Sequence, residues 1–346
     1  MSLFVDFKKK LGDFQLEVRF KTEDNVLGLL GASGSGKSMT LKCIAGIEKP
    51  DEGKIILNGV TLFDSEKRIN LPPQKRKVGY LFQSYALFPN MNVRQNILCG
   101  MHGETNKDVK ERTLAEILEI TQLQGLEKHR PHELSGGQQQ RTALARILVG
   151  SPNLLMLDEP FSALDSQLRA RLQVEMRELL KTFGKSVLIV THDRGEAYRL
   201  CHQIALVDKG KILIQKDTKA LFADPESHEA AVMTGCKNIM DAEKTGEYEL
   251  FVPAWGVHLK TALPLRDDLT AVGIRAHYFN ARTNHNRYPV RFVDMIEEPF
   301  ENIFQFRYEG QDEASPNLWW HLPKDRSPRE PYEAGIAPQN VLPLYG

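Results

Sequence analysis

A glycine-rich segment at Gly31–Ser38, GASGSGKS, matches the phosphate-binding pattern G-x-x-x-x-G-K-[ST]. It follows the apolar run Val26–Leu30 and precedes a helix-like stretch, so we expect a loop between a strand and a helix. Glycines let the backbone wrap closely round a phosphate, and amide N–H groups at the helix N-terminus attract its charge. Lys37 is predicted to reach the terminal phosphates, and the Ser38 hydroxyl to bind Mg²⁺. The expected nucleotide-lining residues are Gly31, Ala32, Ser33, Gly34, Ser35, Gly36, Lys37, Ser38 and Met39.

Two acidic residues, Asp158 and Glu159, follow the apolar run Leu154–Leu157. In an α/β sheet the carboxyl ends of parallel strands meet at one edge, so we expect both acids beside the glycine-rich loop. Asp158 is predicted to hold Mg²⁺, and Glu159 to polarise the attacking water. Acids at a strand end are a weak signal alone and gain weight from the upstream loop.

The elements that must position these residues alternate between strand and helix. Leu154–Leu157 and Val187–Val190 are typical of buried strands in a largely parallel sheet. Apolar residues between them recur three or four apart and predict an amphipathic helix, at Leu164, Leu168, Leu172, Met176, Leu179 and Phe183. Lys54–Phe63 carries Asn58-Gly59 between apolar flanks, which predicts a tight hairpin and an antiparallel portion beside the main sheet.

The composition changes near residue 236. The residues that follow hold all three tryptophans and ten of the eighteen prolines. Runs rich in aromatic and β-branched residues, separated by Pro, Gly, Asp and Asn, predict a small all-β, barrel-like domain there. We therefore expect two domains, residues 1–235 and 236–346.

The bulk composition narrows the function classes. Apolar residues make up 41% and charged residues 26%, as in soluble globular proteins, and 45 Lys+Arg balance 45 Asp+Glu. Bulk charge thus gives no support to nucleic-acid binding. The four cysteines form no C-x-x-C pair, which favours reduced thiols over disulfides or zinc. The N-terminus lacks the apolar segment of a secretory signal, and no stretch reaches the ~20 apolar residues of a membrane span. Any membrane-spanning part is expected on another chain.

The segment LSGGQ at Leu134–Gln138 completes a set of motifs that resembles the ABC ATPases. Phe82-Gln83 resembles the Q-loop of that family, Ser162–Asp165 the D-loop, and Thr191-His192 the switch histidine. The resemblance covers roughly residues 1–235 and includes six motifs in the family's order. It implies an α/β P-loop NTPase cassette with a RecA-like core, an antiparallel β portion and a helical subdomain. The C-terminal domain is similar to the TOBE/MOP-like domains of importer cassettes.

The resemblance also implies roles for residues across a dimer. In this family two cassettes close head to tail over ATP and Mg²⁺, so one chain's signature faces the nucleotide held by the other. His192 would contact the γ-phosphate as a catalytic residue beside Glu159 and Lys37. Gln83 would sense Mg²⁺ and the water, and Asp165 would link the two sites. The signature residues implied are Ser135, Gly136, Gly137 and Gln138.

The segment Tyr85–Ile97 resembles importer sequences that face a permease. This implies two integral membrane permease subunits, an extracytoplasmic solute-binding protein that acts indirectly, and a place at the cytoplasmic face of the membrane. The short opening LGDFQLEVRF most resembles the molybdate-type subunit, which favours molybdate or a related oxyanion such as sulfate. Importer subunits for iron, polyamines or sugars are alternatives, as is a non-transport ATP switch.

An aromatic residue ahead of the phosphate loop usually stacks on adenine in this family. Phe14, in the expected strand DFQLEVRF, is the nearest candidate. Phe4, Phe7 and Phe20 compete with it, and an ordinary core role is open for each.

Overall fold

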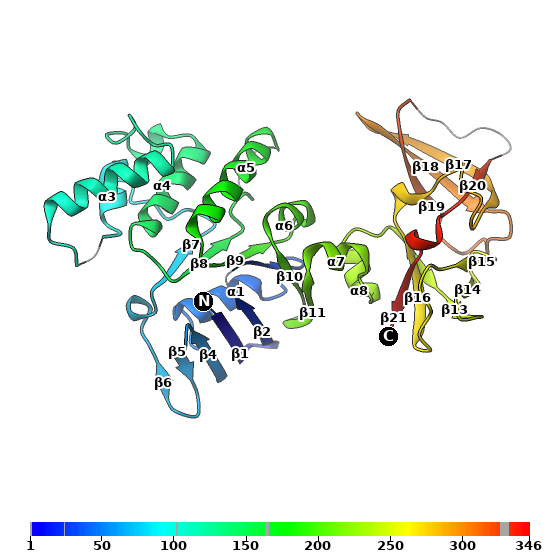
Figure 1. Ribbon diagram of the computed structural model, residues 1–346, viewed down its shortest axis with the longest axis horizontal. Coiled ribbons are helices and arrows are strands. Elements are labelled where there is room, and N and C mark those ends of the chain that lie inside the picture. The colour runs from blue at the N-terminus through cyan, green and yellow to red at the C-terminus, as the bar shows by residue number, and fades with distance from the viewer. Residues whose placement is uncertain (1, 24, 102, 163–165, 326–331) are drawn as a thin grey trace. The chain divides into compact units, whose positions relative to one another are not determined.

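The computed structural model describes residues 2–23, 25–101, 103–162, 166–325 and 332–346, so Asp165 of the predicted D-loop lies outside the described residues. The chain forms two compact units, Met1–Thr218 and Lys219–Gly346 (Figure 1). The sequence-based boundary at 235/236 lies further along the chain. Helix α8 (His228–Met233) contacts strands β16 (Leu269–Ile274) and β21 (Leu342–Tyr345), so it packs with the residues that follow it.

The first unit is built on an eleven-stranded sheet with the order β6-β5-β4-β1-β2-β11-β10-β3-β9-β8-β7. Strands β3, β9, β8 and β7 are parallel neighbours, and β3, β8 and β9 are buried along their whole length, as predicted. Strands that are buried on both faces of a sheet need helices packed against those faces. Helix α1 contacts β8, and helix α6 contacts β3 and β9. The bounds are β3 (Val26–Leu30), β7 (Val78–Leu81), β8 (Leu154–Asp158), β9 (Ser186–Thr191), β10 (Gln203–Asp208), β11 (Lys211–Asp217), α1 (Lys37–Ala45) and α6 (Arg194–Leu200).

An antiparallel portion that starts at β2 forms the other end of the sheet, as the sequence predicts. It comprises β1 (Ser2–Leu11), β2 (Phe14–Glu23), β4 (Glu52–Leu57), β5 (Val60–Asp64) and β6 (Ile69–Asn70). Asn58 and Gly59 join β4 to β5 with φ values of 50° and 78°. Both residues adopt the left-handed backbone conformation, which this type of two-residue β-hairpin turn requires. Asn and Gly adopt that conformation at low energetic cost. The predicted hairpin is confirmed.

A helical subdomain and one long helix complete the first unit. Helices α2 (Val93–Leu98), α3 (Lys107–Ile120) and α4 (Gly136–Leu148) pack together. Their shared core contains Val93, Ile97, Leu114, Ile117, Leu118, Leu123, Leu134 and Ala145. The predicted amphipathic helix is α5 (Ser166–Phe183), which buries Leu172, Met176 and Leu180 and leaves Val174 64% exposed.

The second unit is mainly β-structure, as expected, and its strands belong to three small sheets. The sheets are β12-β16-β21, β13-β14-β15 and β19-β18-β17-β20. The unit has its own aromatic core, in which Trp255, Phe306 and Trp320 are each at most 2% exposed. The remaining bounds are α7 (Thr218–Ala223), β12 (Asn238–Asp241), β13 (Glu243–Lys244), β14 (Glu249–Val252), β15 (Val257–Lys260), β17 (Tyr288–Glu297), β18 (Glu301–Tyr308), β19 (Leu318–Pro323) and β20 (Glu333–Ala334).

Among the helices that the structure describes, none combines the length and the apolar character needed to cross a membrane.

Candidate active site

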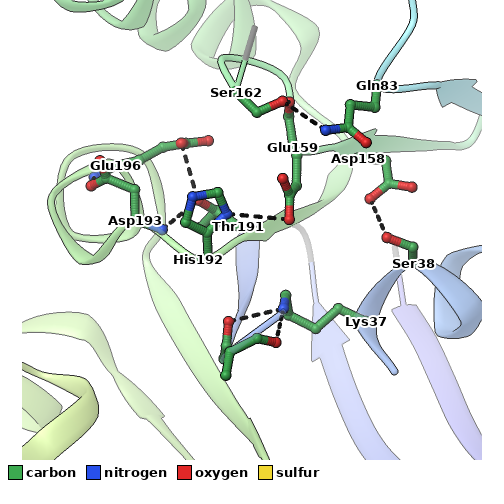
Figure 2. Close-up of polar contacts among 12 residues, drawn as sticks. Lys37, Ser38, Gln83, Asp158, Glu159, Ser162, Thr191, His192, Asp193 and Glu196 are labelled. Carbon is green, nitrogen blue, oxygen red and sulfur yellow. Dashed lines mark hydrogen bonds and ion pairs between the residues drawn. The ribbon is translucent and has the colours of Figure 1, made fainter. Parts of the chain in front are cut away.

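One edge of the parallel sheet gathers most of the predicted site residues. The glycine-rich loop follows β3, Asp158 ends β8, His192 follows β9, and Gln83 follows β7. Because these four strands are parallel neighbours, their carboxyl ends meet, and segments far apart in the sequence come together (Figure 2).

The glycine-rich loop has backbone geometry that only glycine adopts without strain. Gly34 and Gly36 have φ values of 81° and 100°. A Cβ on Gly31 would lie 2.1 Å from the Val207 carbonyl oxygen, so this position leaves no room for a side chain. The loop leads into α1, whose first turn presents free backbone N–H groups. Consecutive amides in this setting form an anion-binding concavity, which fits a phosphate chain.

Lys37 is the first residue of α1, and its ammonium group lies within the glycine-rich loop that precedes the helix. Its Nζ donates to the carbonyl oxygens of Gly31 at 2.9 Å and Ala32 at 2.7 Å (Figure 2). Lys37 is only 4% exposed, and burial lowers its pKa, while the charges of Glu159 and Asp158 act in the opposite direction. The loop therefore concentrates one cation and a set of backbone donors where phosphate oxygens would bind.

Ser38 and Asp158 form the candidate magnesium site. The Ser38 hydroxyl donates to Asp158 Oδ1 at 2.7 Å, and the Tyr80 hydroxyl donates to Oδ2 at 2.8 Å. A hydroxyl and a carboxylate are the hard oxygen ligands that Mg²⁺ prefers, together with substrate phosphates and water. No group of three His, Cys, Asp or Glu side chains in the described part of the chain forms an all-protein metal cage. The residues present thus fit Mg²⁺ held jointly with a nucleotide.

Glu159 contacts His192 directly. The His192 Nδ1 atom lies 3.2 Å from Glu159 Oε1, and the side chains are 53% and 18% exposed (Figure 2). Glu159 has a φ of 45°, unusual for a residue with a side chain, and its N–H donates to the Val190 carbonyl at 2.9 Å. The strained backbone is held by the neighbouring strand β9 and directs the carboxylate toward His192.

Gln83 is exposed and joins the group through Ser162. Its Nε2 donates to Ser162 Oγ at 3.1 Å, and the Ser162 hydroxyl donates to the Glu159 carbonyl at 3.0 Å. This chain of bonds links the segment after β7 to the backbone of the acidic pair.

The signature residues lie apart from this group, at the start of α4. Ser135 Oγ accepts from the Gln138 N–H at 3.3 Å, and Gln138 Oε1 accepts from the Ser135 N–H at 2.8 Å. This reciprocal capping box defines the helix N-terminus. A Cβ on Gly137 would lie 2.9 Å from Leu172 Cδ1, so the glycine permits close packing of α4 on α5. Ser135 is exposed at a helix N-terminus, as a donor to a partner's nucleotide would need to be.

Burial distinguishes among the phenylalanines that are candidates for stacking on the adenine ring. Phe7 and Phe20 are 1% and 4% exposed and belong to the core. Phe14 is half-buried, and its ring lies next to the phosphate loop: a Cβ on Gly36 would be 3.4 Å from Phe14 Cε1. Its stacking on adenine stays a prediction.

Comparison with known proteins identifies the family. The family model described as ABC transporter matches residues 15–162. The spermidine/putrescine import ATP-binding protein PotA of Clostridioides difficile is 39% identical over 241 residues, 69% of this chain and 67% of the relative. The chain belongs to the ABC transporter family of ATP-binding cassettes. These cassettes bind ATP and are ATPases.

Other relatives of the cassette carry different solute names. The molybdenum import ATP-binding protein ModC of Paramagnetospirillum magneticum is 37% identical over 64% of this chain and 61% of its own length. The Fe(3+) ions import ATP-binding protein FbpC of Haemophilus influenzae is 42% identical over 64% of this chain and 63% of its own. The chain thus covers between three fifths and two thirds of these relatives' length.

Solved cassettes share the fold. A dimeric ATP-binding cassette, MJ0796, in a post-hydrolysis state with ADP and phosphate, has a TM-score of 0.53 and 27% identity over 63% of this chain and 99% of its own. The cbiO1 protein of Clostridium perfringens, part of the transporter complex cbiONQ, has a TM-score of 0.55 and 26% identity over 65% of this chain and 91% of its own.

Two residues of the site escaped the sequence analysis. Tyr80 lies inside an apolar strand and reads as a core aromatic, yet its hydroxyl bonds Asp158. Glu196 lies in the short helix α6 after His192, and its carboxyl accepts a hydrogen bond from the Thr191 hydroxyl. The tyrosine hydroxyl in an otherwise apolar run marks Tyr80 as polar, but only the pairing of β7 with β8 shows that its partner is Asp158.

Proposed function

We propose that this cassette hydrolyses ATP to drive solute import through separate membrane subunits. The observation that supports it best is the Glu159–His192 contact of 3.2 Å beside the Ser38–Asp158 hydrogen bond of 2.7 Å. A general base, a phosphate-contacting histidine and two oxygen ligands at one sheet edge are the parts that phosphoryl transfer to water requires. The relatives named as import ATP-binding proteins support the direction of transport.

In the proposed reaction the residues bind, orient and move one proton. The loop amides and Lys37 bind the phosphates and oppose their charge. The Glu159 carboxylate accepts a proton from the attacking water as the water oxygen bonds to the γ-phosphorus. The bond between that phosphorus and the β–γ bridging oxygen breaks, which leaves ADP and phosphate. His192 orients toward the γ-phosphate, and Mg²⁺ held by Ser38 and Asp158 would neutralise charge on the phosphate oxygens.

The proposed active form is a head-to-tail homodimer. Each signature helix N-terminus, beginning at Ser135, would face the nucleotide of the other chain and complete its site. The dimeric state of MJ0796 supports this arrangement. Two integral membrane permeases would follow the opening and closing of the pair at the cytoplasmic face of the membrane, and a solute-binding protein outside would deliver the cargo.

The identity of the transported solute is a separate part of the proposed function. We propose molybdate or a related oxyanion such as sulfate, because the short opening LGDFQLEVRF resembles that of the molybdate-type subunit. The ModC relative supports it with 37% identity, while PotA and FbpC, at 39% and 42%, support polyamines and ferric ion equally well. Uptake of polyamine and of ferric ion must therefore be measured beside uptake of oxyanions.

The test is ATPase activity of the purified chain with Mg²⁺, wild type beside Glu159→Gln. Loss of the general base should lower kcat by about 10²–10⁴-fold, while ATP still binds and drives the variant into a dimer on a sizing column. Wild-type turnover in Glu159→Gln would contradict the assigned role. ATP-driven dimers with no turnover in either protein would favour the non-transport switch.

The same two proteins test the cargo in cells. A strain that lacks this gene is complemented with wild type or with Glu159→Gln, and uptake of labelled molybdate, sulfate, spermidine and ferric ion is measured. Import of one oxyanion that needs the wild-type chain supports the proposal. Restoration of spermidine or iron uptake instead would assign the cassette to that solute.

A further inference from the structure

A buried acid lies beside the segment that carries the switch histidine. Glu196, in α6, is 4% exposed, and its Oε2 accepts a hydrogen bond from the Thr191 hydroxyl at 3.0 Å (Figure 2). Its Oε1 is buried and has no hydrogen-bond partner among the residues that the structure describes. Burial of an acid is costly in free energy, and the proposed ATP hydrolysis assigns no role to this carboxyl.

The Thr191 hydroxyl links the residues that precede and follow His192 in the chain. It donates to Glu196 and accepts from the Asp193 N–H at 3.0 Å. Asp193 in turn caps α6, because its Oδ1 accepts from the Glu196 N–H at 2.9 Å. The residues before and after His192 are therefore tied to one buried carboxyl, whereas the imidazole is half exposed and contacts Glu159. The backbone of this short segment sets where the imidazole points.

The surroundings of the Glu196 carboxyl favour its neutral form. Burial raises the pKa of Glu196 to about 8, the Asp193 and Glu159 carboxylates act in the same direction, and the Thr191 bond and Arg169 act against it. A neutral carboxyl in this place needs no counter-ion. The charged and titratable groups that face it are Asp193 on its own element, Arg169 from α5, Glu159 at the end of β8, and Cys201 after α6.

We propose that Glu196 is a positioning residue for catalysis, which holds His192 against Glu159 through the Thr191 hydroxyl. The inference rests on the role given to His192 under the proposed function. It predicts that the bond between Glu196 and Thr191 matters more than the charge of Glu196. The amide of Gln and the hydroxyl of Ser would preserve that bond, and Leu and Val would remove it with little change in volume.

The experiment compares four variants of the full chain: Glu196→Gln, Glu196→Leu, Thr191→Ser and Thr191→Val. One readout is kcat against KM for ATP. The other is the ¹³C-labelled imidazole signal of His192, assigned by its absence in His192→Ala, which needs no turnover. Glu196→Leu and Thr191→Val should lower kcat by roughly tenfold or more with KM for ATP within about twofold, and should shift the His192 signal. Glu196→Gln and Thr191→Ser should keep both readouts.

The pH profile tests whether the bond to Thr191 or the charge of Glu196 matters. The Thr191 hydroxyl can donate to the carboxyl in either protonation state, so ionisation of Glu196 should not lower kcat, and wild type and Glu196→Gln should share one pH profile. A fall of kcat near pH 8 in wild type that is absent from Glu196→Gln would assign the effect to the charge and contradict the inference. The matched control is Thr121→Val, because Thr121 and Thr191 are both 1% exposed. Thr121 follows α3 in the helical subdomain, and its hydroxyl donates to the Ile117 carbonyl of that helix. It should leave kcat, its pH profile and the His192 signal unchanged.

An unmoved His192 signal in both Thr191→Val and Glu196→Leu would overturn the inference. So would equal losses in Glu196→Gln and Glu196→Leu, since the amide keeps the acceptor. Where the apolar variants do not fold, the Gln and Ser variants still decide, because a tenfold loss of kcat in either contradicts the inference. If wild type itself shows no turnover, the proposed function fails, and the His192 signal still tests the positioning.

Discussion

Both oxygens of the Asp158 carboxylate have partners, which fixes the plane of the group at the candidate magnesium site. Ser38 bonds one oxygen and Tyr80 the other, at 2.7 and 2.8 Å. Burial and the nearby Asp158 charge raise the pKa of Tyr80, so its hydroxyl stays protonated and can only donate to the carboxylate. Partners behind a metal ligand orient it toward the metal, and their loss costs affinity.

Tyr80→Phe should therefore weaken metal binding with little change in packing. We expect the Mn²⁺ concentration that half-saturates the protein in the presence of nucleotide to rise by about 10–100-fold, measured by electron paramagnetic resonance in the Glu159→Gln background. The control is Tyr308→Phe, since the Tyr308 hydroxyl is buried without a partner in the described residues. Equal Mn²⁺ binding by Tyr80→Phe and the control would show that the hydrogen bond has no part in holding the metal.

Residues within continuous motifs were predictable, and residues that act through space were not. Lys37, Asp158 and Glu159 stand in segments whose pattern predicts their chemistry, and the resemblance to the ABC ATPases adds His192. The structure brings all four residues to one sheet edge. Tyr80 bonds an acid 78 residues away, and no local pattern announces that pair. Such partners depend on which strands lie side by side, which the sheet order alone reveals.

At the scale of the element, the segment between β7 and α2 is shaped by side chains and not by glycine. Tyr85 and Ala86 are both left-handed, with φ values of 58° and 45°. Arg146 donates to the Tyr85 carbonyl at 3.1 Å, and its guanidinium lies 5.2 Å from the Phe88 ring centre. The Asn58-Gly59 hairpin was predictable because its turn residues are the ones that the turn demands, whereas this bend has no such signal.

Asn96 fastens the same segment. It is fully buried, and its side chain bonds the N–H and carbonyl of Phe88 and the carbonyls of Met91 and Asn92. Asn96→Ala removes all four bonds; the Phe88 and Asn92 carbonyls keep backbone partners, whereas the Phe88 N–H and the Met91 carbonyl lose the Asn96 side chain. The variant should lower the free energy of unfolding by about 2–3 kcal/mol in urea titration. Asn106→Ala, which removes only the exposed cap of α3, should cost about 1 kcal/mol. Equal losses in the two variants would contradict the fastening role.

At the scale of the whole molecule, the two units have separate hydrophobic cores. The strands of the second unit were predictable from runs rich in aromatic and β-branched residues, but their division among three sheets was not. The core of this unit joins residues that are remote in the sequence: the Phe279 ring centre lies 5.0 Å from that of Phe306 and 6.1 Å from that of Trp320. Aromatic content predicts burial and does not specify which ring meets which.

Separate cores predict that nucleotide stabilises the units unequally. All three tryptophans, Trp255, Trp319 and Trp320, lie in the second unit, so their fluorescence reports its unfolding. The long helices α3, α4 and α5 lie in the first unit and dominate the helical circular dichroism signal. A non-hydrolysable ATP analogue with Mg²⁺, at 100 times its Kd, should stabilise the first unit by about 2.7 kcal/mol and raise only the circular dichroism midpoint. A rise of the tryptophan fluorescence midpoint by the same amount would mean that the two cores unfold as one cooperative body. The control is Lys37→Ala, which weakens phosphate binding and should abolish the nucleotide-induced rise of the midpoint in either case.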